Sequence, residues 1–244
     1  MEKHRSTICL GCWQHMHVPI ALKGPLSWPF RMFGIKASRM NPNTCTICEN
    51  NFTTVMKARN ITTDATVLFA DLRGYTALSQ TLPPEGVQAL LDAFYDECGE
   101  AIWRFDGLLN KTLGDAVMAI FNFPLLHEDH AAKAVQAARA ILAGCARRQA
   151  ELAGRFGLSD ADLGVGIGID TGMTAFGEFG TSHRDLTAIG TVVNRAARAQ
   201  SAARPGEILV TRAVLDRTGA LLGQAREGLY QLKGFAEPVS LYNA

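Results

Sequence analysis

The stretch TVLFADLRGYT, residues 66–76, is the part of the sequence that decides the fold. Its first five residues form a short, mostly apolar run, which ends at Asp71, and the turn-forming Gly74 follows three positions later. Such a run between turn signals is typical of a strand that is buried inside a sheet. We therefore predict a buried strand over residues 66–70 with a carboxylate at its end.

The residues that follow alternate between helix and strand patterns. Apolar residues recur at three- and four-residue spacing in two long segments and predict two amphipathic helices, the first of them opened by Pro83 and Pro84. Short apolar runs predict further strands, and Thr191 is expected to cap a third helix. The predicted helices are 84–102, 129–153 and 191–202, and the predicted strands are 108–113, 116–121, 163–170, 175–179, 208–210, 229–232 and 239–242.

The order of these elements predicts an α+β fold. From residue 66 it is strand, helix, strand, strand, helix, strand, which is the ferredoxin-like βαββαβ arrangement with helices on one face of the sheet, here with extra C-terminal strands. In that topology the first and third strands are neighbours, and the turn before the third strand contains Asp115. We therefore expect Asp71 and Asp115 to lie side by side.

Composition and charge limit the classes of protein to consider. The 244 residues have a net charge of +1, so no overall positive field indicates nucleic-acid binding. Residues 1–59 carry eight Lys or Arg against two acids, without long helix or strand periodicity. We predict a basic, irregular N-terminal segment over residues 1–60, with a metal-binding or regulatory role, and one main domain over 61–244.

Targeting signals are also missing from the printed sequence. No apolar run approaches the roughly 20 residues that span a bilayer, and the first residues lack the pattern of a signal peptide. We therefore expect no transmembrane segment and a cytoplasmic location.

Two carboxylates that share a site repel each other unless a cation lies between them. Oxygen ligands without a neighbouring His or Cys favour Mg²⁺ or Mn²⁺ over zinc, and Mg²⁺ completes its shell with phosphate oxygens and water. Asp71 and Asp115 are therefore candidate ligands of a metal–nucleotide site. The alternative is that each Asp simply ends a strand in a turn, where this residue is common.

Four segments resemble, in the right order, the motifs of the class III adenylyl and guanylyl cyclase family. They are FADLRGYT at 69–76, KTLGDAVMAIF at 111–121, GIGIDTG at 166–172 and TAIGTVVNRAAR at 187–198. The family often has His where Asp170 stands. The resemblance implies that 61–244 is a cyclase catalytic domain. It implies an adenylate cyclase, a phosphorus–oxygen lyase that converts ATP to 3′,5′-cyclic AMP and pyrophosphate in cyclic-nucleotide signalling.

The resemblance also assigns roles to residues of the first and last motifs. Asp71 and Asp115, with the backbone carbonyl of Leu72, would hold two Mg²⁺ or Mn²⁺ ions in each active site. Asn194 and Arg198 are four positions apart and share one face of a helix. They would position the ribose and stabilise charge on the α-phosphate in the transition state.

Further residues would bind the nucleotide. Lys111 and Thr187 would read adenine, because Lys can donate to adenine N1 and Thr can accept from the exocyclic amine. Adenylyl cyclases more often have Asp where Thr187 stands, and guanylyl cyclases typically use Glu and Cys at these two positions. Lys233 would contact the terminal phosphates, whereas Arg195 is expected on the surface.

The family forms its active sites between two chains, with the metal-binding Asp residues from one chain and the Asn and Arg from the other. Because this chain has both sets, the resemblance implies a head-to-tail homodimer with ATP as substrate. The alternatives are a catalytically degenerate cyclase-fold module that binds nucleotide or a partner, and a guanylate cyclase. A diguanylate cyclase would need a GGDEF-type hairpin, and neither a Walker A nor a Rossmann glycine fingerprint occurs in the sequence.

The N-terminal segment contains two CxxC pairs, which are candidates for a second metal site. Four thiolates can complete a tetrahedral shell around Zn²⁺, and an iron–sulfur cluster uses the same ligands. The 32 residues between the pairs exceed the common zinc-ribbon gap, so free thiols remain an equal alternative. His15 and His17 could replace a thiolate as ligands. The paired residues are Cys9, Cys12, Cys45 and Cys48, and the second pair lies in SRMNPNTCTICE, which resembles a segment ahead of some bacterial cyclase domains.

Overall fold

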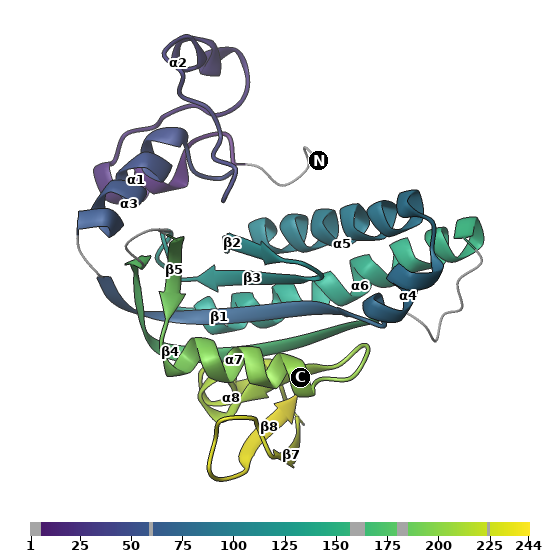
Figure 1. The fold of residues 1–244 in the computed structure, drawn as a ribbon. Coiled ribbons are helices and arrows are strands. Elements are labelled where there is room, and N and C mark those ends of the chain that lie inside the picture. Colours follow the sequence, from purple (N-terminus) through teal and green to yellow (C-terminus); the bar gives the residue numbers. More distant parts are fainter. Residues whose placement is uncertain (1–5, 59–60, 157–163, 180–184, 224) are drawn as a thin grey trace.

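An eight-stranded mixed sheet forms the centre of the chain in the computed structural model (Figure 1). The structure describes residues 6–58, 61–156, 164–179, 185–223 and 225–244. The strands are β1 (Ile61–Arg73), β2 (Leu108–Leu113), β3 (Ala116–Phe121), β4 (Gly164–Phe179), β5 (Asp185–Ile189), β6 (Ile208–Thr211), β7 (Arg226–Tyr230) and β8 (Val239–Asn243). The helices are α1 (Leu10–Met16), α2 (Trp28–Met32), α3 (Thr46–Ala58), α4 (Tyr75–Thr81), α5 (Pro84–Arg104), α6 (His130–Phe156), α7 (Thr191–Ala202) and α8 (Arg212–Thr218), with 3-10 turns at Pro25–Ser27 and Gly219–Leu221.

The strand order confirms the predicted α+β class with its ferredoxin-like core. β1 pairs antiparallel with β3 on one side and with β4 on the other, which gives the order β2-β3-β1-β4 within the βαββαβ unit. β4 pairs in parallel with β6, and β8 and β7 extend the sheet further as the extra C-terminal strands. β5 also pairs with β4, but it is not part of this consecutive strand order. The first and third strands of the unit are therefore neighbours, as expected.

Helices cover both faces of the sheet, whereas the sequence led us to expect them on one face. α5 and α6 lie on one face, where Leu68 and Ala70 of β1 enter the larger core (Figure 1). α7 lies on the other face, where Val67 and Phe69 enter a second core. Side chains alternate between the faces of a strand, so a strand covered on both faces is apolar at every position. This explains the uninterrupted apolar run over residues 67–70.

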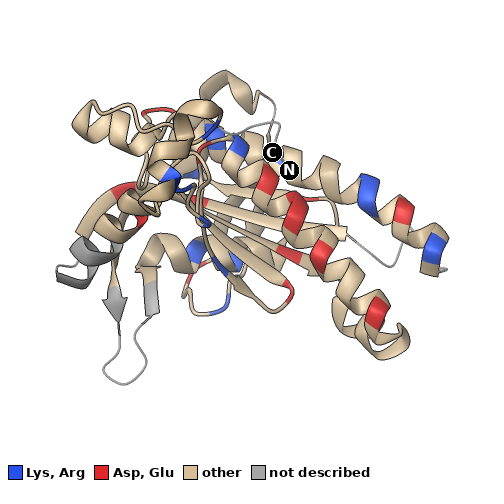
Figure 2. Ribbon diagram, turned by 90° about the horizontal axis from the view of Figure 1, so that it is seen from above, with Lys and Arg blue, Asp and Glu red and all other residues tan. Residues whose placement is uncertain are grey.

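α5 and α6 carry opposite charge (Figure 2). α5 contains five acidic residues and one basic residue, and α6 contains five basic residues and one acidic residue. Glu97 of α5 lies 3.4 Å from Arg148 and 3.5 Å from Arg147 of α6. Each such exposed pair stabilises little by itself, but the complementary charges favour the alignment of these two helices over the sheet.

Several predicted boundaries differ from the structure. The Gly-rich strand and its expected return strand form one continuous strand, β4, whose C-terminal part pairs with β5; Leu163 lies outside the described residues. Gly190, and not Thr191, occupies the N-cap of α7 and makes no side-chain cap hydrogen bond. α4 and α8 are additional helices of 7 residues each. Such short helices contain too few turns to show a periodic pattern.

Residues 6–58, called the N-terminal module below, contain α1, α2 and α3 joined by irregular segments. The module lies beside the edge of the sheet at which β2 begins (Figure 1), and the Leu109 N–H of β2 donates to the Met40 carbonyl oxygen at 3.1 Å. Among the described helices of the chain, none has both the length and the apolar content that crossing a membrane requires.

Candidate active site

Asp71 and Asp115 meet at one end of the sheet. Asp71 lies near the end of β1 and is the register partner of Ala116 in β3. Asp115 precedes Ala116 in the turn between β2 and β3, and its carbonyl oxygen accepts a hydrogen bond from the Leu72 N–H at 3.0 Å. Gly114 gives this turn a left-handed backbone with φ of 65°, which a residue without a Cβ adopts readily. The topology thus brings the two carboxylates together.

A hydrogen bond from α5 also stabilises this turn. The Tyr95 hydroxyl donates a hydrogen bond to the Gly114 carbonyl oxygen. Burial raises the pKa of Tyr95, so this hydroxyl keeps its proton at neutral pH. Sequence periodicity places Tyr95 on the apolar face of α5, but periodicity carries no information about the partner of a hydroxyl group.

Asp71 is a half-buried carboxylate with charged neighbours. Burial raises the pKa of Asp71, the Arg73 guanidinium lowers it, and the Asp115 carboxylate raises it again. Arg73 Nη1 lies 2.9 Å from Asp71 Oδ2, and the same side chain donates to the Gln200 carbonyl oxygen of α7. The guanidinium contacts Asp71, and the Asp115 carboxylate adds a second negative charge beside it, so an additional cation would be stabilised here.

The donor set suits a hard divalent cation. Asp71 and Asp115 offer carboxylate oxygens, and the Leu72 side chain has no donor atom, so only the backbone carbonyl of Leu72 could act as a ligand. Oxygen ligands of this kind suit Mg²⁺ and Mn²⁺. The residues at this end of the sheet therefore fit the metal group that the resemblance implies.

Asn194 and Arg198 lie on the exposed face of α7, one helical turn apart. The opposite face, which includes Val192 and Ala196, is buried against the sheet. Within the described ranges, neither the Asn194 amide nor the Arg198 guanidinium has a hydrogen-bond or ion-pair partner. Both polar groups are therefore free to contact another molecule.

α7 approaches β4 closely because β4 contains Gly168. A Cβ at this position would lie 2.0 Å from the Gln200 backbone nitrogen and 2.3 Å from the Ala196 carbonyl oxygen. Only glycine leaves room for backbone at these distances. Gly168 thus determines how closely α7, the helix that carries Asn194 and Arg198, packs against β4.

Arg195 differs from the expectation of a surface residue. Its Nε lies 2.6 Å from Asp170 Oδ2, and the Asp170 side chain is fully buried. Asp170 also accepts hydrogen bonds from the Thr211 hydroxyl at 2.6 Å and the Thr171 N–H at 2.8 Å. Burial raises the pKa of Asp170, while the bonds from Thr211 and Arg195 lower it. The pair therefore anchors α7 to β4 and β6, and sequence reasoning missed it because Arg195 and Asp170 are brought together only by the tertiary fold.

Lys111 and Thr187 come from β2 and β5, which are far apart in the sequence. The Thr187 hydroxyl lies 3.5 Å from the side-chain oxygen of Asn110, the residue before Lys111. The structure thus places the two predicted purine-reading positions close together. Lys233 lies in the loop between β7 and β8, at the opposite edge of the sheet from β2, and its side chain is exposed. Within one chain, Lys233 is therefore separated from Lys111.

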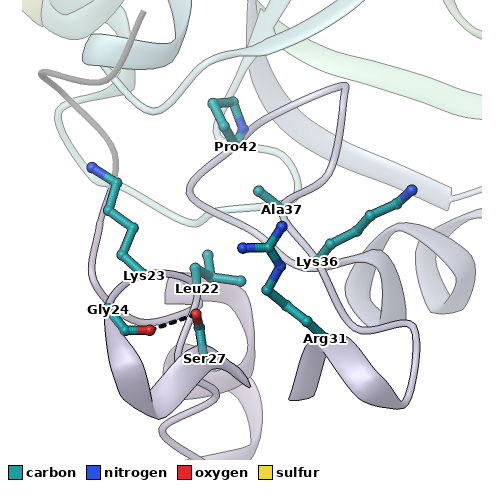
Figure 3. A pocket seen from close by; sticks show the side chains of 8 residues that line it. All are labelled: Leu22, Lys23, Gly24, Ser27, Arg31, Lys36, Ala37 and Pro42. Carbon is teal, nitrogen blue, oxygen red and sulfur yellow. Dashed lines mark hydrogen bonds between the residues drawn. The ribbon is translucent and has the colours of Figure 1, made fainter. Parts of the chain in front are cut away.

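A separate cavity of about 660 Å³ lies in the N-terminal module (Figure 3). Three of its lining side chains are cationic, namely those of Lys23, Arg31 and Lys36. Ser27 closes one side by donating to the Gly24 carbonyl oxygen at 2.7 Å. Positive charge around the cavity disfavours a metal ion, so this cavity is distinct in kind from the carboxylate site.

Comparisons with known proteins agree with this geometry. The family model described as the adenylate and guanylate cyclase catalytic domain matches residues 58–242. An adenylate cyclase of Anabaena cylindrica is 33% identical over 183 residues, which are 72% of this chain and 36% of that protein. An uncharacterized protein of Mycobacterium tuberculosis is 34% identical over 181 residues, which are 72% of this chain and 31% of that protein. The chain thus spans about a third of the length of these curated relatives.

Two solved structures share the fold. The adenylyl cyclase CyaB from P. aeruginosa is 30% identical with a TM-score of 0.69, and the match covers 76% of this chain and 95% of that one. The guanylyl cyclase Cya2 is 26% identical with a TM-score of 0.67, and the match covers 75% of this chain and 92% of that one. Both purine classes therefore occur among the relatives.

Proposed function

The chain belongs to the adenylate and guanylate cyclase catalytic domain family, and on that premise we propose that it is an adenylate cyclase, which converts ATP to 3′,5′-cyclic AMP and pyrophosphate. The observation that carries this proposal is the meeting of Asp71 and Asp115 at the end of β1. Residues 61–244 would form the catalytic domain, and the N-terminal module would be an addition to it.

Each polar group of the site has a chemical task in this proposal. Asp71, Asp115 and the Leu72 carbonyl would hold two Mg²⁺ or Mn²⁺ ions, which when bound supply positive charge to the phosphates and favour loss of the ribose 3′-hydroxyl proton. The Asn194 amide would hold the ribose in position. The Arg198 guanidinium would donate to the α-phosphate oxygens, where charge increases as the new bond to phosphorus forms.

The choice of ATP rests on Lys111 and Thr187. Lys111 donates, which matches adenine N1, and the Thr187 hydroxyl can accept from the exocyclic amine. Guanine presents a carbonyl oxygen and a protonated ring nitrogen at the same positions, so it pairs poorly with these groups. Because the relatives include both adenylyl and guanylyl cyclases, a guanylate cyclase is the second candidate.

The decisive measurement is product formation from Mn-ATP and Mn-GTP by the purified chain. We expect cyclic AMP as the main product. The Lys111→Glu variant should shift the ATP-to-GTP ratio of kcat/KM by about 10- to 100-fold towards GTP, the effect of about 1.4–3 kcal/mol from one charged hydrogen bond. Cyclic GMP as the main wild-type product would contradict the adenylate assignment. A dimeric preparation that makes neither product would favour a degenerate nucleotide-binding module.

We also propose that two copies complete each site as a head-to-tail homodimer. Asn194 and Arg198 support this proposal, because both are exposed and have no polar partner in the described part of the chain, so their polar groups need a partner surface or substrate to act. Asp71→Asn and Arg198→Gln chains should each be inactive alone. A heterodimer of the two has one intact site and one doubly altered site, so random mixing should restore about a quarter of wild-type activity. Mixed dimers without activity would refute the shared site.

A further inference from the structure

The sulfur atoms of both CxxC pairs gather at one buried point of the N-terminal module. The four ligand atoms all lie within 4.8 Å of one another, and every one of the four residues is buried. Cys12 Sγ lies 3.3 Å from Cys48 Sγ and 3.5 Å from Cys45 Sγ, and Cys9 Sγ lies 3.6 Å from Cys48 Sγ. The long gap between the pairs therefore does not keep them apart.

Two similar local structures build this cluster. Cys9 is the N-cap of α1, and Cys12 lies in the first turn of that helix. Cys45 likewise directly precedes α3, and Cys48 lies in its first turn. Gly11 gives α3 room, because a Cβ there would lie 3.0 Å from Cys48 Sγ. Each CxxC pair thus presents two sulfurs from the start of a helix to the same point.

Backbone donors also point at the cluster. The N–H groups of Cys12 and Cys45 donate to Cys9 Sγ at 3.3 Å and 3.1 Å. Such hydrogen bonds stabilise a thiolate more than a thiol, because a thiolate is the stronger acceptor. The surroundings of Cys9 are therefore arranged for a negatively charged sulfur.

The spacing of the sulfurs indicates one mononuclear metal ion. A tetrahedral zinc ion with Zn–S bonds of about 2.3 Å places its four sulfurs about 3.8 Å apart, close to the separations seen here. A disulfide would need about 2.05 Å between two sulfurs, and all four residues are free cysteines. In an iron–sulfur cluster the thiolates bind different iron atoms around a larger inorganic core. The observed cluster surrounds a single point instead.

The module also has only a small apolar core of its own. In the described part of the module, Ile20 is the only buried hydrophobic residue besides the four cysteines. Large apolar side chains are exposed, namely Leu26, Trp28, Met32 and Phe33. Small units with so little apolar core usually depend on a disulfide or a metal ion.

We propose that Cys9, Cys12, Cys45 and Cys48 bind one zinc ion, which holds the N-terminal module together. Binding Zn²⁺ to the four thiols releases their protons and involves no change of oxidation state. The two histidines that could have replaced a thiolate are not needed. His15 Nε2 lies 3.2 Å from the Pro124 carbonyl oxygen, and His17 is exposed at the end of α1.

The zinc site is connected to the catalytic domain through the segment that precedes Cys45. The Asn41 amide donates to the Gly107 carbonyl oxygen at 3.0 Å, and the Asn43 amide donates to the Trp103 carbonyl oxygen at 3.1 Å. Trp103 lies in the last turn of α5, and Gly107 directly precedes β2. The metal thus holds in place the segment that contacts the start of β2, the strand that carries Lys111.

The test is the metal content of the full chain, purified without chelator and passed through a desalting column. We expect elemental mass spectrometry to find one zinc ion per chain. Titration with a mercurial reagent should release this zinc as four thiols react, and this measurement needs only the wild-type chain. Cys45→Ser and Cys48→Ser variants should lose the zinc, whereas Cys98→Ala should keep it, because Cys98 is buried in the larger core.

Exchange with Co²⁺ provides a spectroscopic check. Tetrahedral thiolate coordination should give intense visible and near-ultraviolet absorption, which Cys45→Ser should lose. Removal of zinc should lower the Tm of the full chain by about 5 °C or more, since a ligand that binds only the folded state stabilises it. A folded wild-type chain without zinc, with iron in its place, or with the four cysteines oxidised to disulfides would overturn the proposal. Cyclase activity is not the readout, so a zinc-free chain that still makes cyclic AMP would refute the zinc site alone.

Discussion

Replacing Arg195 with glutamine should destabilise the folded chain by about 2–3 kcal/mol. The change leaves the fully buried Asp170 without its ion-pair partner, and breaking a buried pair costs about 3–5 kcal/mol when nothing else compensates. Here the bonds from the Thr211 hydroxyl and the Thr171 N–H remain, and Arg195 is partly exposed, so the loss should lie near or below the lower end of that range.

Arg198 provides a matched control in the same helix. It is exposed and has no partner among the described residues, so Arg198→Gln should change the free energy of unfolding by no more than about 0.5 kcal/mol. If Arg198 stabilises the transition state, the same substitution should lower kcat by about 100- to 1,000-fold. Arg195→Gln should therefore act mainly on stability, and Arg198→Gln mainly on turnover.

The assay is urea unfolding followed by circular dichroism, with kcat measured on the same preparations. The double variant Asp170→Asn with Arg195→Gln should recover part of the lost stability, because it removes the unpaired charge. An Arg195→Gln chain as stable as wild type would refute the anchoring role of the ion pair. Equal destabilisation by Arg198→Gln would refute the proposal that Arg195 acts on stability and Arg198 on turnover.

Three other changes test the fold. Gly168→Ala should cost about 3 kcal/mol and lower activity, because the new Cβ would collide with the backbone of α7; thermal unfolding with kcat measures both effects. Burial lowers the pKa of His130, so the folded state resists protonation and stability should fall as pH drops below about 6.5, by at most about 1.4 kcal/mol per pH unit. Urea unfolding, measured from about pH 8 to about pH 5, should show a smaller loss of unfolding free energy for His130→Asn than for the wild type. His17→Asn, which changes an exposed residue, should behave as wild type. Asn43→Ala should cost about 1–3 kcal/mol, because it removes the hydrogen bonds of the amide to the Trp103 carbonyl and the Asp106 carboxylate. A wild-type unfolding midpoint would contradict the docking of the N-terminal module.

The sequence was sufficient to predict the central part of the fold because its signals are local. The apolar run ending at Asp71 and the tight turn at Asp115 lie within a few residues, and the βαββαβ order then makes their strands neighbours. The structure confirms this fold and shows the predicted closeness of the two residues. The family motifs added roles for Asn194 and Arg198, and these roles stay predictions until the variants are measured.

Other features depend on contacts between distant segments and were not predictable. The continuous β4 was divided in two because its glycines resemble turn signals, although Gly168 serves the close approach of α7. Arg195 was expected on the surface because helix periodicity does not reveal a buried carboxylate on another strand. The CxxC pairs were recognised, but the sequence could not show that 32 intervening residues return the chain to the same point.

Gly166 and Arg73 illustrate how the fold constrains the evolution of this domain. A Cβ at Gly166 would lie 2.5 Å from Arg73 Nε, in the space that the guanidinium occupies beside Asp71. A mutation to alanine at Gly166 would therefore force the Arg73 guanidinium to move, away from its contacts with Asp71 and the Gln200 carbonyl oxygen. The two positions form an epistatic pair, because the effect of a substitution at position 166 depends on the length of the side chain at position 73.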